Sequence, residues 1–176
     1  MKELNVKIGV IEKINPHTYR IGFKSPYLAQ KAKPAQFLHI KIDNKVTLLR
    51  RPFSIHKIKA DTVYVLFKVR GRGTHLLSQY KRGDVLDLIG PLGNGFKYEL
   101  RAKSDEWRIL VAGGIGVAPL LFLGETIRKF QSPNSKSQTI VLLGAKTKNE
   151  ILCGQDFQRL GYKVRIATED GSRGYK

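Results

Sequence analysis

The sequence predicts a fold in two parts, a six-stranded antiparallel β-barrel followed by a parallel-sheet α/β domain. The 176 residues are 41% hydrophobic, which suffices for a core and excludes an intrinsically disordered chain. The first hundred residues show short alternating or β-branched runs separated by turn signals, the pattern of a β-rich domain. The remainder alternates strand-like and helix-like runs, which is typical of a parallel sheet with crossover helices.

Six runs in the first part have the length and alternation of β-strands. Turn signals such as Asn15-Pro16 and Asp43-Asn44 separate them. Six short strands at this spacing predict a small closed barrel. The runs are residues 6–14, 18–23, 37–42, 45–49, 62–69 and 85–89.

The pattern changes after a polar link at residues 101–106. It then gives a strand, a glycine turn and a helix that runs to Phe130, followed by a strand, a helix near residues 149–160 and a last strand. The three strands are expected at residues 108–112, 139–143 and 163–167. We therefore predict a first domain of residues 1–101 and a second of residues 102–176.

Several classes of protein are disfavoured by the sequence. The longest uncharged stretch, residues 109–124, is interrupted by glycines and a proline and is shorter than the roughly 20 residues of a bilayer span. Residues 1–5 lack the apolar core of a secretory signal. A single cysteine, Cys153, and four widely separated histidines offer no evident metal site. We expect a cytoplasmic protein with no membrane span.

The net charge of +18 raises the hypothesis of nucleic-acid binding. The charge is evenly distributed, however: residues 1–49 carry 9 basic and 3 acidic groups, residues 50–100 carry 10 and 4, and residues 101–176 carry 13 and 7. A basic arm or recognition helix would concentrate its charge. The pattern fits an anionic ligand or an acidic protein partner equally well, and we favour no nucleic acid.

The first of four motifs is Arg51-Pro52-Phe53-Ser54, which follows Arg50 where the predicted strand 45–49 ends. An arginine can form two hydrogen bonds with a pyrophosphate, and a serine hydroxyl can reach the polar edge of a ring. The alternative is a cationic strand end with a buried phenylalanine.

Two further motifs are rich in glycine. Residues 66–74 form a strand that enters a loop, whose glycines let backbone N–H groups approach a phosphate; an ordinary turn is the alternative. Residues 90–96, Gly-Pro-Leu-Gly-Asn-Gly-Phe, contain too many turn formers for a strand or helix. They predict a shaped loop, with a domain linker as the alternative.

The fourth motif, residues 111–119, lies between a strand and a helix. Its glycines would let a dinucleotide pyrophosphate lie against the helix N-terminus. Pro119 takes the place of the third glycine of the usual fingerprint, and no acidic residue closes the second strand. The alternative is a tight strand-to-helix turn.

Together and in this order, the four motifs resemble the ferredoxin-reductase superfamily of flavin and nicotinamide proteins. Within it they are most similar to the electron-transfer subunit of the two-subunit, NAD-linked dihydroorotate dehydrogenases. The resemblance covers nearly the whole chain, and it implies an FAD-binding barrel and an NAD-binding domain. It implies FAD contacts for Arg51, Pro52, Phe53, Ser54, Leu66, Phe67, Lys68, Gly73 and Thr74, and nicotinamide-nucleotide contacts for Gly114, Gly116, Val117, Ala118 and Pro119.

The resemblance also implies a function. Such a subunit passes electrons between NAD(H) and a dihydroorotate dehydrogenase catalytic subunit through FAD and a [2Fe-2S] cluster, in pyrimidine biosynthesis, within a heterotetramer. No side chain is assigned as a catalytic acid or base. The alternatives are another ferredoxin-reductase-like NAD(P)H flavoprotein subunit, or a cationic nucleic-acid-binding barrel with exposed aromatics such as Tyr19, Tyr27 and Tyr80.

The sequence departs from the family pattern at several points. The family often has arginine where this chain has Lys68, and it continues beyond the position of Lys176 into further strands and four cluster-binding cysteines. We therefore expect a truncated nucleotide domain without the cluster's ligands, and we expect Cys153 at a buried helix position. The family favours NADH, but Lys146 and Lys148 follow the second parallel strand and can accept the 2′-phosphate of NADPH.

Overall fold

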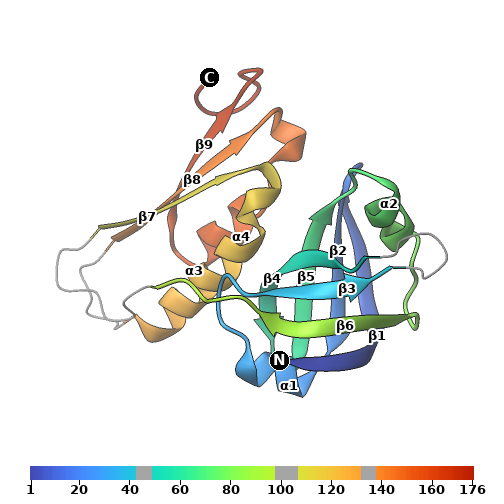
Figure 1. The fold of residues 1–176 in the computed structure, drawn as a ribbon. Helices are drawn as coiled ribbons and strands as arrows, with labels where there is room; N and C mark the ends of the chain where they lie inside the picture. The colour runs from blue at the N-terminus through green and yellow to red at the C-terminus, as the bar shows by residue number, and fades with distance from the viewer. Residues whose placement is uncertain (43–48, 98–106, 132–137) are drawn as a thin grey trace. The chain divides into compact units, whose positions relative to one another are not determined.

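The computed structural model describes residues 1–42, 49–97, 107–131 and 138–176. The chain forms two compact units, Met1–Phe96 and Lys97–Lys176 (Figure 1). The predicted domain boundary between residues 101 and 102 lies outside the described residues. No helix within the described ranges is both long and apolar enough to cross a membrane.

The first unit is a closed antiparallel barrel, as predicted (Figure 1). Its strands are neighbours in the order β1-β2-β5-β4-β3-β6, and every neighbouring pair is antiparallel. The strands are β1 (Lys2–Asn15), β2 (Thr18–Lys24), β3 (Phe37–Lys41), β4 (Arg51–Lys59), β5 (Thr62–Lys68) and β6 (Val85–Leu92).

The barrel forms because alternate residues of its strands are large and apolar. In β3, for example, Leu38 and Ile40 are fully buried, whereas His39 between them is only partly covered. Period-two alternation of this kind turns one face of each strand to the interior. Fully buried core residues from the other strands are Ile8, Ile21, Phe23, Ile55, Val63, Val65, Leu86 and Leu88.

The structure corrects the predicted position of the first motif. Most of the predicted strand 45–49 lies outside the described residues, and Arg51-Pro52-Phe53-Ser54 forms the first half of β4. Phe53 and Ile55 are buried on the inner face of the strand, whereas Pro52 is exposed on the other face. This alternation is that of a strand, and the cluster of arginines and a proline concealed it.

Two short helices, which the sequence analysis did not predict, accompany the barrel. Helix α1 (Pro26–Lys31) begins at Ser25, whose Oγ accepts a hydrogen bond from the Leu28 N–H at 3.4 Å. Helix α2 (Arg72–Ser78) occupies part of the predicted glycine loop. The third motif was also only partly predicted, because its first three residues, Gly90–Leu92, continue strand β6.

The second unit is the predicted parallel sheet, with strand order β7-β8-β9. Along the chain β7 (Trp107–Gly113) leads through a 3-10 helix, η1 (Gly114–Val117), into α3 (Ala118–Phe130). Strand β8 (Gln138–Ala145), η2 (Lys148–Glu150), α4 (Gly154–Arg159) and β9 (Lys163–Thr168) follow. Helices α3 and α4 lie on the same face of the sheet (Figure 1).

One sheet face therefore carries the core of this unit. Leu110, Ala112, Val141 and Leu143 are buried on that face. The predicted helix 149–160 is shorter than expected, and Cys153 is not a buried helix position. It is the N-cap of α4, partly exposed, with a left-handed φ of 61°, because the chain turns there before the helix begins.

Candidate functional site

The first and second motifs lie side by side in the barrel. Strands β4 and β5 are antiparallel neighbours with Ile55 opposite Val65, so the start of β4 adjoins the end of β5. The rings of Phe53 and Phe67 meet edge to face with centroids 5.7 Å apart. Tyr19 of β2 stacks on Phe67 at 5.9 Å. The sequence-predicted residues of both motifs are thus brought to one end of two neighbouring strands.

The two arginines at the start of β4 differ in their surroundings. Arg50 donates to Asp87 Oδ1 at 2.8 Å and to Glu3 Oε1 at 2.6 Å, so its positive charge is paired with two carboxylates of the barrel. Arg51 is exposed and makes no ion pair with any residue that the structure describes. Of the two, Arg51 is the guanidinium available for an external anion.

The end of β5 leads directly into the turn before α2. Leu66 and Phe67 are buried and Lys68 is half-buried. The Thr74 Oγ1 accepts from the N–H groups of Arg70 at 2.9 Å and Gly71 at 3.2 Å, and it donates to the Gly71 carbonyl at 3.1 Å. The Thr74 hydroxyl therefore fixes the turn. A Cβ on Gly71 would meet nothing within 4 Å, so the backbone is open to an approaching group.

The third motif is held close to the first through β3. Gly93 has a φ of +77°, and a Cβ there would lie 2.8 Å from the Phe37 ring, so a glycine is required. The Gln36 side chain donates to the Gly93 carbonyl at 2.8 Å. Phe37 is the register partner of both Leu92 and Ser54. The half-buried Ser54 hydroxyl therefore lies one strand away from this loop.

The fourth motif forms the expected strand-to-helix turn. Gly114 has a φ of +51°, and a Cβ on Gly114 or Gly116 would meet nothing within 4 Å. Val117 and Ala118 are buried, with exposed fractions of 1% and 3%, so they pack beneath the turn and only the glycines before them are open. Pro119 lies in the first turn of α3, where its missing N–H breaks no helical hydrogen bond. The Ala118 N–H donates to the Ile115 carbonyl and Pro119 has no N–H, so the accessible backbone of this motif is that of Gly114 and Gly116.

A feature that the sequence analysis missed lies at the carboxyl ends of β8 and β9. The loop after β9, residues 169–172, returns to the end of β8: the Asp170 N–H donates to the Lys146 carbonyl at 3.2 Å, and the Lys148 N–H donates to Ser172 Oγ at 2.8 Å. The string Asp170-Gly171-Ser172 signals a turn. No local signal indicates which strand end that turn will meet.

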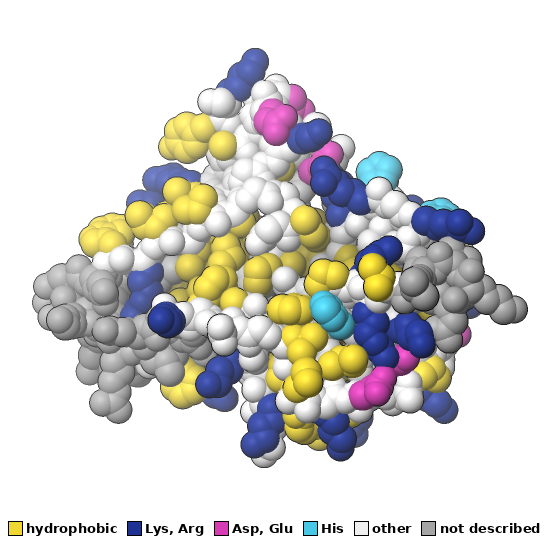
Figure 2. Space-filling model, in the orientation of Figure 1, with side chains coloured by type: hydrophobic (Ala, Val, Ile, Leu, Met, Phe, Trp, Pro, Cys, Tyr) yellow, Lys and Arg dark blue, Asp and Glu magenta, His cyan; other side chains and the backbone are white. Residues whose placement is uncertain are grey.

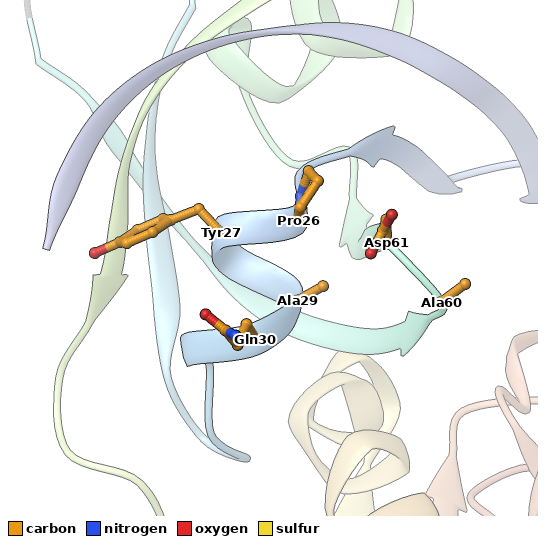
Figure 3. A pocket seen from close by; sticks show the side chains of 6 residues that line it. All are labelled: Pro26, Tyr27, Ala29, Gln30, Ala60 and Asp61. Atoms are coloured by element: carbon orange, nitrogen blue, oxygen red, sulfur yellow. The ribbon is translucent and has the colours of Figure 1, made fainter.

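Two other features are separate from the four motifs. A hollow of about 610 Å³ lies beside α1 and the turn between β4 and β5, and no sequence-predicted site residue lines it (Figure 3). Its lining comprises Pro26, Tyr27, Ala29, Gln30, Ala60 and Asp61.

In the described ranges no three His, Cys, Asp or Glu side chains are grouped as metal ligands. Lys and Arg side chains are scattered over the surface seen in Figure 2, in keeping with their spread along the sequence.

Comparison with known proteins identifies the relatives of this chain. No family model matches it. The chain is 40% identical over 178 residues to a protein of Desulforamulus reducens, covering 99% of this chain and 65% of the relative. It is 36% identical to a Bacillus pumilus protein, covering 100% of this chain and 67% of the relative. Both relatives are named dihydroorotate dehydrogenase B (NAD(+)), electron transfer subunit.

Solved structures agree with this relationship. An NADH-dependent reduced ferredoxin-NADP oxidoreductase matches with a TM-score of 0.82 and 28% identity, over 97% of this chain and 59% of the other. A ferredoxin-NADP+ reductase from Plasmodium falciparum matches with a TM-score of 0.77 and 15% identity, over 97% and 72%, which shows the shared fold alone. The chain spans about two thirds of the length of the curated relatives that it matches. By its sequence identity and coverage, this chain belongs to the family of dihydroorotate dehydrogenase B electron transfer subunits.

Proposed function

We propose that this chain passes electrons between NAD(H) and a dihydroorotate dehydrogenase catalytic subunit, with FAD bound in the barrel and the nicotinamide nucleotide bound in the second unit. The observation that carries the proposal is the convergence of the first and second motifs at the adjoining ends of β4 and β5. Membership of the electron transfer subunit family supports it.

The barrel residues fit FAD. Exposed Arg51 offers the two-pronged donor that a pyrophosphate accepts, and the open Gly71 backbone with Gly73 and Thr74 lies where β5 ends. Ser54 offers a hydroxyl to the polar edge of the ring. Pro52, Phe53, Leu66, Phe67 and Lys68 complete the proposed FAD contacts, with buried Phe53, Leu66 and Phe67 holding the strands in place.

The glycine turn of the second unit fits the nicotinamide nucleotide. Gly114 and Gly116 leave space for a pyrophosphate and offer it the backbone of the glycine turn. Val117, Ala118 and Pro119, at the entry to α3, complete the proposed nucleotide contacts. When bound, FAD supplies the hydride chemistry, and this chain supplies position and hydrogen bonds. No general acid or base is needed from the chain.

The iron-sulfur cluster expected of the family does not fit the residues of this chain. A [2Fe-2S] cluster takes four thiolates, and the sequence contains one cysteine. We expect no stoichiometric iron or acid-labile sulfide in the 176-residue protein, as measured by iron and sulfide analysis; stoichiometric amounts of both would contradict this expectation.

The family name implies a partner, because an electron transfer subunit requires a catalytic subunit to exchange electrons with. We propose a dihydroorotate dehydrogenase catalytic subunit in a heterotetramer that acts in pyrimidine biosynthesis in the cytoplasm. Co-purification of a tagged chain with that catalytic subunit tests the assignment. Two proteins that elute separately at micromolar concentration would contradict it.

The flavin site is tested by the visible spectrum of the purified protein and by FAD titration. The parent should show the absorption bands of oxidised flavin. Arg51→Ala should lose a charge-assisted contact worth about 2 to 4 kcal/mol, which corresponds to binding weaker by some tens to hundreds of times. Arg82→Ala, an exposed arginine in the turn before β6, removes the same charge outside the motifs and should bind like the parent. Equal FAD affinity of Arg51→Ala and Arg82→Ala would refute the role of Arg51.

A further inference from the structure

The hollow beside α1 has walls that the fold holds in place. Its volume of about 610 Å³ lies within the range of about 300 to 1,000 Å³ that is usual for ligand sites. The Ser25 N–H donates to the Asp61 carbonyl at 2.8 Å, which ties the start of α1 to the turn between β4 and β5. Fully buried Leu28 anchors the helix. Ala29 points toward the turn that carries Ala60 and Asp61 (Figure 3).

Small apolar side chains make up half of the lining. Pro26, Ala29 and Ala60 carry no polar side-chain atom, so the space between them can take an apolar group. Gln30 and Asp61 add an amide and a carboxylate, and both residues are exposed. An apolar side chain of a partner can therefore enter the hollow while its polar backbone stays within reach of hydrogen-bonding groups.

Three lysines, which we call the lysine rim, lie beside the hollow. Thr62 directly follows the turn that lines it, and the strand register places Lys24 on one side of Thr62 and Lys59 on the other. Lys57 lies in the next outward row, opposite Tyr64, with its ammonium 5.2 Å from the ring centroid. None of the three lysines makes an ion pair with a residue that the structure describes.

The lysine rim faces away from the barrel interior and its charge is available to a partner. Phe23 and Val63 are fully buried, so the residues next to them along β2 and β5 point outward. By contrast, Arg20 on the same outer surface donates from Nε to Glu12 Oε2 at 2.9 Å, so its charge is paired within the barrel. Unpaired cations around an apolar hollow favour an acidic partner surface.

We propose that the hollow and the lysine rim anchor the catalytic subunit, which presents an apolar side chain flanked by carboxylates. The inference rests on the proposed function, which supplies that partner. An apolar anchor inside a polar rim is the usual arrangement of protein interfaces. Three lysines outnumber the single carboxylate of the lining, so the local field attracts an acidic surface and speeds association. The flavin motifs lie at the opposite ends of β4 and β5, so docking here leaves them open.

Biolayer interferometry with the purified catalytic subunit tests the anchor. The double variant Lys24→Glu, Lys59→Glu reverses two exposed charges, and its Kd should rise about tenfold or more, chiefly through slower association. Ala29→Gln fills the hollow without changing the charge and should raise the Kd through faster dissociation. The control Lys7→Glu, Lys81→Glu reverses two other exposed lysines of the barrel and should bind like the parent, although its net charge matches that of the first variant.

The outcomes separate this inference from the proposed function. Reduction of the bound flavin by NADH should be the same in the parent and in every variant, which also shows that the variants fold. If the lysine variant binds the catalytic subunit as tightly as the parent does, the anchor is refuted while the proposed function stands. Equal weakening by the control would also refute it, because net charge alone would then govern binding.

A nucleic-acid partner is a further outcome of the same variants. Binding of a short DNA duplex that the lysine variant loses, with affinity for the catalytic subunit unchanged, would assign the lysine rim to nucleic acid and overturn the inference. A parent protein that binds no catalytic subunit would overturn the proposed partner as well as the anchor. Flavin that NADH does not reduce would overturn the proposed function itself.

Discussion

The two units differ in how completely their sheets are covered. The barrel closes on itself, so each of its six strands has a neighbour on both sides and its inward side chains form one core. The sheet of the second unit has one buried face. On its other face the exposed fractions are 57% for Trp107, 60% for Ile109 and 67% for Val111. Hydrophobic side chains are visible along β7 in Figure 2. The barrel therefore has a complete core, whereas the core of the second unit rests on one sheet face.

The largest expected effect lies in the barrel core. Phe23 of β2 is fully buried, and Phe23→Ala leaves a cavity at a site enclosed by paired strands. We expect a loss of about 3 to 5 kcal/mol in the free energy of unfolding, measured by urea denaturation followed by circular dichroism. A loss below about 1 kcal/mol would show that the barrel interior is not close-packed there.

Strand β7 allows the two faces of the second sheet to be compared directly. Leu110 is buried against the helices and its neighbour Ile109 is exposed. Leu110→Ala should lower the free energy of unfolding by about 2 to 5 kcal/mol, whereas Ile109→Thr should change it by about 0.5 kcal/mol or less. Denaturation of both variants under the same conditions provides the test. Equal losses would mean that the second face is also covered in solution.

A smaller effect is expected at Tyr162, which follows α4. Its buried hydroxyl donates to the Gly124 carbonyl of α3 at 2.7 Å, and Tyr162→Phe should cost about 1 kcal/mol. Burial raises the pKa of Tyr162 from 10.0 to about 12. Because the unfolded chain loses this proton first, the stabilisation is complete below pH 10.0 and is lost as the pH rises to about 12.

The pH dependence of unfolding checks this assignment. The parent should lose stability across that alkaline interval, and the phenylalanine variant should lack the part of the slope that comes from Tyr162. If parent and variant show the same slope, the Tyr162 hydroxyl is not buried as described.

The sequence predicted the barrel and the parallel sheet well because both follow from hydrophobic periodicity. It failed where chemistry interrupts that pattern. Arg51 and Pro52 hid the alternation of Phe53 and Ile55 in β4, and Gly71 and Gly73 suggested a loop where α2 forms. Glycine lowers helix propensity, but tertiary packing overrides a preference of this size.

The candidate site shows the same division. The glycine turn after β7 was predictable because its residues are contiguous and its geometry is local. Asp170 was not, because its place beside Lys146 depends on the pairing of β9 with β8 and on hydrogen bonds between segments more than twenty residues apart. The residues directly after β8 include two lysines, and the tertiary structure brings the loop that carries Asp170 beside them from the end of β9.

Anaerobic addition of NADH to the purified, FAD-loaded protein tests the central claim most directly. The claim is that one chain holds a flavin in its barrel and a nicotinamide nucleotide in its second unit so that electrons pass between them. We expect stoichiometric NADH to bleach the visible bands of the bound flavin in the parent protein. Arg51→Ala should bleach only to the extent that it still retains FAD. A protein that holds FAD but keeps its full visible absorbance after excess NADH would contradict the account.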